Sequence, residues 1–313
     1  MSKEQKYALA IHGGAGTILK EHMTSEKEAA YHKALEAALK AGEYILKRNG
    51  SAIDAVTEAV ACLEDSDLFN AGKGSVFTNN EDHELEASIM DGKTKNAGAI
   101  CAVKHIKNPV RLSRRILDDN EFVFLAGEGA EEYAVKNGFS LVSNDYFFSD
   151  FRYEQLKSVK NEGTMKLDHD SDKKFGTVGA VAIDKEGNIA GATSTGGLTN
   201  KKYGRIGDSP VIGSGVYADN NACAISCTGY GEYFLRAVTA YDIAAIMQYK
   251  EVSLQEAADK VIMEKMVELG GEGGIIGIDG KGNIVFSFNC EGMYRGKVTE
   301  GLPAETMIYK NNS

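Results

Sequence analysis

The sequence predicts an α+β fold built on antiparallel sheets, and three observations support this. Two segments have the pattern of hairpins made of paired strands, over residues 179–193 and 274–288. Both hairpins carry the pattern Gly-x-x-x-Ile-Asp-x-x-Gly-Asn-Ile without a solenoid period, which indicates two hairpins of one core. Helical patterns form separate groups, whereas a doubly wound parallel sheet would alternate strands with helices.

The amino-terminal region predicts one strand and two helices. Residues 7–11 form the apolar strand, and the next five residues, HGGAG, have the pattern of a loop whose glycines allow close backbone approach. Such a loop could direct N–H groups at an anion, but His12 fits packing or loop bracing better than chemistry. The capping box at residues 25–28 begins an amphipathic helix that ends near Asn49, and an alanine-rich helix follows over 51–63.

The middle of the chain predicts a further hairpin, two helices and a linker. Strands are expected at 85–90 and 97–103, a helix begins at Pro109, and a short strand and a helix follow at 122–125 and 127–136. The composition then turns polar without an apolar period, so a flexible linker is expected over about residues 157–176. Beyond the first repeated hairpin, we expect strands at 211–217 and 222–227 and helices at 232–248 and 253–269.

Charge and composition narrow the classes of function. The chain has 313 residues, a formal net charge of −10 and a pI near 5.2, so its acidic surface disfavours nucleic acids and anionic membranes. No apolar run reaches the roughly 20 residues of a membrane helix, and the amino-terminal run is too short for a signal peptide. Five cysteines without CxxC spacing suit reduced thiols, so we expect a cytoplasmic protein. The acidic charge favours a small or zwitterionic substrate.

The chemistry suggested by the sequence lies in threonines next to glycines. Common catalytic signatures such as GxSxG, GxxxxGK[ST], HExxH and a strand followed by GxGxxG are absent from the sequence. Threonines with neighbouring glycines stand at three predicted strand ends, namely Thr177, Thr195 and Thr228. One such threonine alone is ordinary, because threonine favours strands. Three together favour a site where the ends of neighbouring strands converge.

We interpret Thr177 as the nucleophile. A threonine hydroxyl attacks poorly unless a base removes its proton, and an amino-terminal threonine can use its own α-amine for this. Thr177 is internal, so this interpretation requires cleavage of the Gly176–Thr177 bond. The amine so released would have a pKa of about 7.7–8. Gly176, which has no side chain, would let that peptide adopt the geometry that cleavage needs.

Arg205 and Asp208 form the candidate recognition pair. A guanidinium can bind a carboxylate through two hydrogen bonds and a carboxylate can bind an ammonium, so the pair suits an amino acid or dipeptide zwitterion. Spacing alone fits an ion pair on a surface loop equally well.

Seven motifs occur in an order that resembles a known family: HGGAG, LFNAGKGSVF, HELEASIMDG, GTVGAVAID, ATSTGG, GRIGDSP and SCTGYGE. They look like the plant-type isoaspartyl peptidase/L-asparaginases, which are N-terminal nucleophile hydrolases of the threonine type. The resemblance covers nearly the whole chain and is loosest in the polar linker. It implies a four-layer αββα sandwich of two antiparallel sheets flanked by helices.

The resemblance also implies a division of the chain and a role for each site residue. Self-cleavage would give an α subunit, 1–176, and a β subunit, 177–313, which together form one domain and pair into a dimer of αβ pairs. Thr177 would be nucleophile and base, and Thr195 would orient it. The oxyanion hole would consist of the Thr228 hydroxyl and the Gly229 N–H. The remaining implied substrate-binding groups are Arg205 for the carboxylate, Asp208 and the Gly231 carbonyl for the amine, and Asn70 lining the site.

No cofactor is expected for the chemistry, but the resemblance implies a structural sodium ion. Its ligands would be main-chain carbonyls, which tolerate side-chain differences from the family at Ser66 and Lys73. The six implied ligands are Leu63, Glu64, Ser66, Phe69, Ala71 and Lys73. The implied substrates are β-aspartyl dipeptides and L-asparagine, both hydrolysed to L-aspartate.

Three other functions compete with this one. A glycosylasparaginase would also use an amino-terminal threonine, but that family typically has an aspartate where this chain has Gly176. A threonine endopeptidase of the taspase kind typically carries a longer linker. A non-catalytic binding protein for acidic amino acids would keep Arg205 and Asp208 but would have no need of the three threonines.

Overall fold

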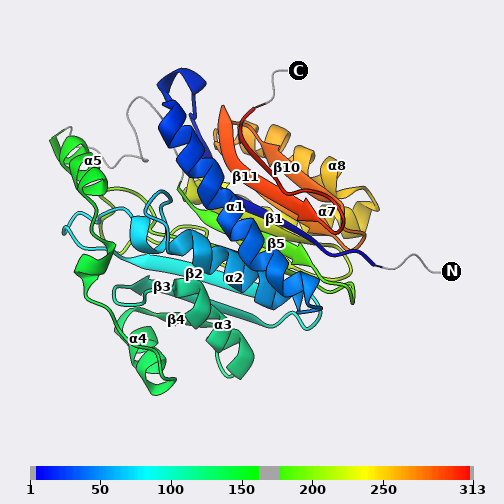
Figure 1. Ribbon diagram of the computed structural model, residues 1–313, viewed down its shortest axis with the longest axis horizontal. Helices are drawn as coiled ribbons and strands as arrows, with labels where there is room; N and C mark the ends of the chain where they lie inside the picture. The colour runs from blue at the N-terminus through cyan, green and yellow to red at the C-terminus, as the bar shows by residue number, and fades with distance from the viewer. Residues whose placement is uncertain (1–4, 162–175, 311–313) are drawn as a thin grey trace.

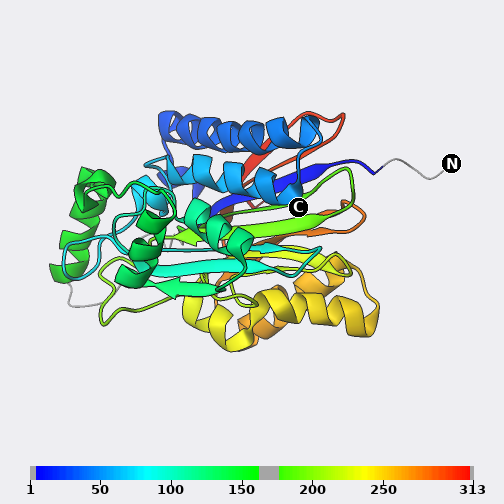
Figure 2. The ribbon, with the colours of Figure 1, turned by 90° about the horizontal axis from the view of Figure 1, so that it is seen from below.

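The computed structural model describes residues 5–161 and 176–310, and these residues form four layers (Figures 1 and 2). Two sheets lie face to face in the middle. The helices α1 (Ser25–Lys47) and α2 (Ala52–Glu64) cover one sheet, and the helices drawn in yellow in Figure 2 cover the other. The predicted αββα sandwich is confirmed.

The larger sheet is mostly antiparallel and contains the strand that follows Thr177. Among the described residues only the pairing of its last two strands is parallel. The order of its eight strands is β12 (Glu305–Tyr309), β11 (Gly292–Thr299), β1 (Ala8–Gly16), β5 (Val178–Ile183), β6 (Ile189–Thr195), β2 (Leu85–Asp91), β3 (Ala97–Val103) and β4 (Phe124–Ala126).

The smaller sheet and its helices come from the carboxyl-terminal part of the chain. Its four antiparallel strands are, in order, β10 (Ile284–Phe288), β9 (Gly273–Asp279), β8 (Cys223–Gly229) and β7 (Val216–Ala218). The helices that cover it are α6 (Gly231–Ala237), α7 (Thr239–Lys250), α8 (Leu254–Asp259) and α9 (Met266–Glu268), with the π-helical segment Lys260–Lys265 between the last two.

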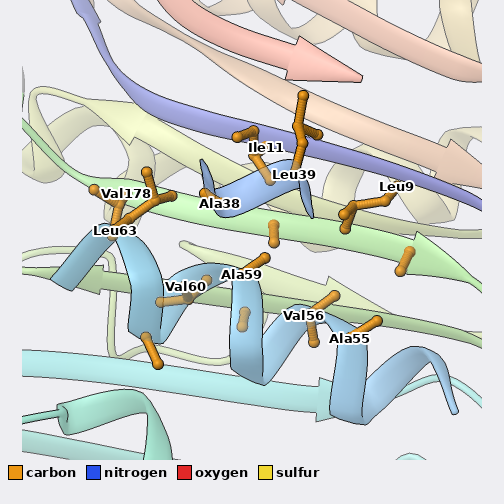
Figure 3. Packing of buried hydrophobic residues seen from close by; sticks show 14 of the residues in the cluster. Leu9, Ile11, Ala38, Leu39, Ala55, Val56, Ala59, Val60, Leu63 and Val178 are labelled. Carbon is orange, nitrogen blue, oxygen red and sulfur yellow. The ribbon is translucent and has the colours of Figure 1, made fainter. Parts of the chain in front are cut away.

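Alternation along the strands sorts side chains between the outer cores and the layer between the sheets. In β1, Leu9 and Ile11 pack against the helices, whereas Ala8 and Ala10 face the smaller sheet. Figure 3 shows the outer core, where α1 and α2 place small residues such as Ala38 and Ala59 against β1 and β5. Because successive side chains of a strand point to opposite faces, this register also decides which threonines face the neighbouring sheet.

The remaining helices lie beside the larger sheet. They are α3 (Pro109–Asp119), α4 (Gly127–Lys136) and α5 (Asp150–Asn161), and Figure 1 shows α5 at one end of the molecule. Three short 3₁₀ turns complete the described structure, at Lys20–His22, Gly72–Gly74 and Asn144–Phe147. None of the described helices combines the length and the apolarity that a membrane crossing requires.

The linker prediction is wrong in its first part. Residues 157–161 form the last turn of α5, which Leu156 and Val159 anchor by burial. The helix was missed because its few apolar residues do not make a full stripe. The rest of the predicted linker, 162–175, lies outside the described residues.

Other differences have local causes. The HGGAG segment continues β1 instead of forming a loop, with its pairing to β11 shifted between His12 and Ala15. The expected strand at 211–217 is reduced to β7, and the expected helix at 232–248 is broken at Val238, which has a φ of 50°. Thr24, not Ser25, caps α1 by accepting the Lys27 N–H. The strands β11 and β12 were not predicted.

Candidate active site

Three strands of the two sheets bring the threonines together. Val178 and Ala180 face the helices, so Thr177, one residue earlier in the alternation, faces the smaller sheet. The same parity directs Thr193 and Thr195 of β6 toward that sheet, and directs Ser226 and Thr228 of β8 toward β5, against which β8 packs. The site therefore lies in the layer between the sheets, at one end of the strands.

Thr177 and Thr195 are in direct contact. The Thr177 hydroxyl donates to Thr195 Oγ1 at 3.3 Å, and Thr195 Oγ1 also accepts the Gly197 N–H at 3.0 Å. Both threonines are buried. Because Thr195 Oγ1 is fixed by the backbone of its own turn, it can hold the Thr177 hydroxyl in one orientation.

His12 braces the backbone of Thr177. His12 Nδ1 lies 3.0 Å from the Thr177 carbonyl oxygen, and His12 Nε2 lies 2.8 Å from Ser226 Oγ. A carbonyl can only accept, so we assign the proton to Nδ1, and Nε2 then accepts from Ser226. Complete burial lowers the pKa of His12 to about 3, against the opposing effect of its Thr177 bond, so the ring is neutral.

Glycines permit this bracing. A Cβ on Gly179 would lie 2.0 Å from Ser226 Oγ and 2.4 Å from His12 Nε2, so only glycine fits between them. Ser226 continues the network to Thr193 Oγ1 at 2.7 Å, and Thr193 Oγ1 lies 3.0 Å from the Gly215 carbonyl oxygen. The backbone at the amino end of β5 is thus tied to the smaller sheet by neutral hydrogen bonds.

Asn70 joins a loop of the amino-terminal half to this end of the sheet. The Asn70 side-chain amide donates to the Gly197 carbonyl at 2.7 Å, and the main-chain carbonyl of Asn70 accepts the Gly196 N–H at 3.1 Å. A Cβ on Gly176 would lie 2.2 Å from Asn70 Cβ. Asn70 therefore contacts both the predicted cleavage site and the turn that holds Thr195, and close approach gives a direct reason for glycine at 176.

The Thr228 hydroxyl is buried, and among the described residues it has no hydrogen-bond partner. A buried hydroxyl without a partner costs about 1–3 kcal/mol, so its position needs a reason other than stability. It stands on the face of β8 that is directed at β5, one residue before Gly229 at the end of the strand. The group is free to donate to an oxyanion formed there.

Arg205 and Asp208 are brought together with Gly231. A Cβ on Gly231 would lie 2.7 Å from Arg205 Nη2 and 3.0 Å from Asp208 Oδ1. Asp208 is buried, and its Oδ2 has no partner among the described residues. Burial raises the pKa of Asp208 to about 7, with Arg205 acting in the opposite direction. A bound ammonium would favour the ionised carboxylate.

Arg205 is also paired with Glu232, which sequence reasoning did not place in the site. Arg205 Nε and Nη2 donate to the two carboxylate oxygens of Glu232, each at 2.9 Å. Burial alone would lower the pKa of Arg205, but Glu232 and the nearby Glu86 outweigh it and raise that pKa. The sequence signal for Glu232 was an acid one residue after the predicted amine ligand Gly231. Ser226 gave no signal beyond its place in the strand alternation.

Two of the six predicted sodium ligands, Glu64 and Phe69, have main-chain carbonyls close to glycines of their loop. Gly72 has a φ of 52°, and a Cβ there would lie 2.3 Å from the Glu64 carbonyl oxygen. A Cβ on Gly74 would lie 2.1 Å from the Phe69 carbonyl oxygen and 2.7 Å from that of Asp67. The close approach of these carbonyls accounts for glycine at both positions. Within the described residues, no group of three or more His, Cys, Asp or Glu side chains is arranged to hold a metal ion.

The comparisons with known proteins agree with this geometry. The family model described as asparaginase matches residues 5–308. The chain belongs to the asparaginase family. Within that family it is 50% identical to the isoaspartyl peptidase of Escherichia coli strain K12, over 97% of each chain. It is 40% identical to the isoaspartyl peptidase/L-asparaginase of Homo sapiens, over 91% of each chain.

Proposed function

We propose that this chain is an isoaspartyl peptidase and L-asparaginase that hydrolyses β-aspartyl dipeptides and L-asparagine and releases L-aspartate. The observation that carries the proposal is the layer between the sheets, where Thr177 contacts Thr195 and where the Thr228 hydroxyl has no partner within 5–161 and 176–310. The names of the relatives, over nearly the full chain, support the same activity. We further propose that the chain is of the plant-type, threonine-dependent kind.

Activation would begin with cleavage between Gly176 and Thr177. The Thr177 hydroxyl would attack the Gly176 carbonyl carbon, and the C–N bond would break as the nitrogen takes up the hydroxyl proton, which leaves an ester and a free α-amine. Water would then hydrolyse the ester to the Gly176 carboxylate and the free Thr177 hydroxyl. The contact of Gly176 with Asn70, and the bond from His12 to the Thr177 carbonyl, support a fixed geometry for this peptide. The products would be an α subunit, 1–176, and a β subunit, 177–313.

Hydrolysis would then use the freed α-amine as base. The amine takes the hydroxyl proton, Thr177 Oγ1 attacks the side-chain carbonyl of the substrate, and the Thr228 hydroxyl and the Gly229 N–H receive the negative oxygen. The protonated amine returns its proton to the leaving group, which departs as ammonia or an amino acid. Water activated by the same amine attacks the acyl-enzyme and releases L-aspartate.

Recognition would depend on the α-groups of the substrate. Arg205 would bind the α-carboxylate, and Asp208 with the Gly231 carbonyl would bind the α-ammonium. Asp208 Oδ2, which has no partner in the described part of the chain, and the close approach of Gly231 to both side chains support this assignment. Because both substrates present identical α-groups, the same binding groups serve both. We call these groups, Arg205, Asp208 and the Gly231 carbonyl, the clamp.

The proposal includes a sodium ion, a dimer and a location. Main-chain carbonyls would hold sodium, which would stiffen the loop that carries Asn70 without taking part in the chemistry. The ligand set is that of Leu63, Glu64, Ser66, Phe69, Ala71 and Lys73. Two αβ pairs would associate, and the protein would work in the cytoplasm.

A denaturing gel and two assays test the proposal. Purified protein is expected to run as fragments 1–176 and 177–313, to release ammonia from L-asparagine and to release leucine from β-aspartyl-leucine. Thr177→Ala should run as one uncut band without either activity, because it lacks the hydroxyl that both steps need. A Thr57→Ala variant, which removes a buried hydroxyl that donates within α2, is the control and should be cut. Hydrolysis by Thr177→Ala, or full activity of an uncut chain, would refute the mechanism.

A further inference from the structure

A buried ion pair lies between the nucleophile and the clamp. Glu86 of β2 and Lys201 are both buried, and Lys201 Nζ lies 3.1 Å from Glu86 Oε1. Lys201 Nζ also donates to the Glu84 carbonyl at 2.9 Å. Buried ion pairs contribute little net stability, because desolvation offsets their attraction. Stability alone therefore does not explain the Glu86–Lys201 pair, and we consider which groups it holds in place.

The backbone of Glu86 belongs to the nucleophile side. In the register of β2 and β6, Glu86 stands directly opposite Thr195, the residue that orients Thr177. Lys201 lies under the turn that follows Thr195, since a Cβ on Gly197 would lie 3.1 Å from Lys201 Nζ. The ion pair is thus anchored to the strand ends that carry the chemistry.

The carboxylate of Glu86 reaches the clamp side. Glu86 Oε2 accepts the Gly207 N–H at 3.1 Å, in the middle of the Arg205–Asp208 segment. A Cβ on Gly207 would lie 2.9 Å from Arg205 Nη1, so the guanidinium lies directly over this peptide. The Glu86 carboxylate therefore connects β2, which pairs with the strand of Thr195, to the Gly207 peptide that the Arg205 guanidinium contacts.

We infer that Glu86, held by Lys201, is a positioning residue that sets the spacing between the clamp and the nucleophile and so selects substrates by length. This inference rests on the proposed function. In β-aspartyl dipeptides and L-asparagine, one methylene separates the scissile carbonyl from the α-carbon, whereas γ-glutamyl compounds have two. With the α-groups fixed at Arg205 and Asp208, the clamp-to-nucleophile distance decides which carbonyl meets Thr177 Oγ1.

Two variants test this role. Glu86→Gln with Lys201→Met removes both charges of the pair while keeping similar side-chain lengths. Glu86→Asp keeps the charge but shortens the carboxylate, so that it cannot hold both Lys201 and Gly207. The control is Asp242→Asn with Lys265→Met, in a partly exposed ion pair. Lys265 likewise donates to a carboxylate, at 2.9 Å, and to a main-chain carbonyl, but in the helical layer.

The measurement is kcat and KM for β-aspartyl-leucine and for γ-glutamyl-leucine, on protein whose self-cleavage has been checked by gel. Displacement of a bound substrate by about 1 Å can cost about a hundredfold in rate. We expect both Glu86 variants to be cut normally, to raise the KM for β-aspartyl-leucine about tenfold and to lower the preference for it over γ-glutamyl-leucine about tenfold. The control should leave the preference unchanged.

The alternatives are separable. If the double variant does not fold, Glu86→Asp alone decides. If the Glu86 variants keep the wild-type KM and preference, or lose kcat equally on both substrates as their melting temperature falls, the pair is merely structural and the inference is refuted. If the wild-type protein hydrolyses neither β-aspartyl-leucine nor L-asparagine, the proposed function fails instead.

Discussion

The two sides of the candidate site differ in the charge of their groups and in the secondary structure that holds them. The nucleophile side consists of neutral groups, with His12, Thr195 and Thr228 on strands β1, β6 and β8 and Thr177 directly before β5. The clamp side, made of Arg205, Asp208 and Glu232, consists of charged groups in a loop and at the start of α6. His12 is paired with a strand on each side, and Thr195 and Thr228 are each paired with one strand, whereas the loop depends on a few side-chain bonds such as that from Gly207 to Glu86.

This difference suggests that the two sides of the site affect different kinetic constants. Neutral donors held by paired strands can stabilise a developing charge without reorganising, which raises kcat. Charged groups in a loop recognise the α-groups of the substrate, and binding that is equal in ground and transition states changes KM alone. Changes on the nucleophile side should therefore act on kcat, and changes on the clamp side on KM.

The largest effect should come from Thr228→Val on the nucleophile side. Loss of one oxyanion donor typically costs about 10²–10³ in kcat, and KM for β-aspartyl-leucine should change little. Since the Thr228 hydroxyl is buried without a partner among the described residues, its removal should raise the melting temperature or leave it unchanged. Thr239→Val is the control, because the Thr239 hydroxyl is equally buried but donates to the Phe234 carbonyl at 3.3 Å. A Thr228→Val enzyme with wild-type kcat would remove this residue from the oxyanion hole.

On the clamp side, Arg205→Lys should give the next largest effect. Lysine keeps the charge but cannot make the two parallel bonds of a guanidinium, so KM should rise about 10- to 100-fold with a smaller change in kcat. Steady-state kinetics on L-asparagine measure both. Arg111→Lys is the matched control, since Arg111 makes the same two-bond pair with Glu58 at the surface. A fall in kcat at constant KM would contradict the division between the two sides.

Asp208 predicts a pH dependence of binding. Its pKa is raised to about 7, mainly by burial, so the carboxylate is protonated below that pH and loses its charge for the substrate ammonium. The dissociation constant of L-aspartate should therefore rise as pH falls below about 7, approaching tenfold per pH unit. Calorimetry with L-aspartate measures this without turnover. Asp208→Asn should bind more weakly and show a flat profile over the same range. An unchanged slope in that variant would assign the titration to another group.

The sequence was sufficient to predict the hairpin strands that carry the threonines, although β11 and β12 were missed. The α+β sandwich is confirmed, because hairpin turns and strand alternation are local signals. Of the family prediction, membership of the asparaginase family is confirmed by the family model. The same alternation placed Thr177, Thr195 and Thr228 at strand ends, and the structure brings Thr177 and Thr195 into contact. Register between strands then follows from which face is apolar.

The contacts missed by sequence reasoning all join segments far apart in the chain. Glu232 lies 27 residues from Arg205, and Ser226 lies 214 residues from His12. No periodicity within one element reports such a pairing. The helix α5 was missed for a different reason. Its composition is mostly polar, like that of a linker, and its two buried apolar residues, Leu156 and Val159, are too few to give a helical pattern.

The smallest effect should come from sodium, and it tests whether the loop at residues 63–74 belongs to the nucleophile side. Asn70 ties that loop to Gly196 and Gly197, next to Thr195. Replacing sodium by choline at equal ionic strength should lower the melting temperature by about 2–4 °C and reduce kcat about threefold, with KM unchanged. Restoring sodium should reverse both changes. Indifference of both quantities to sodium would refute the ion site, whereas a change confined to KM would place the loop on the clamp side.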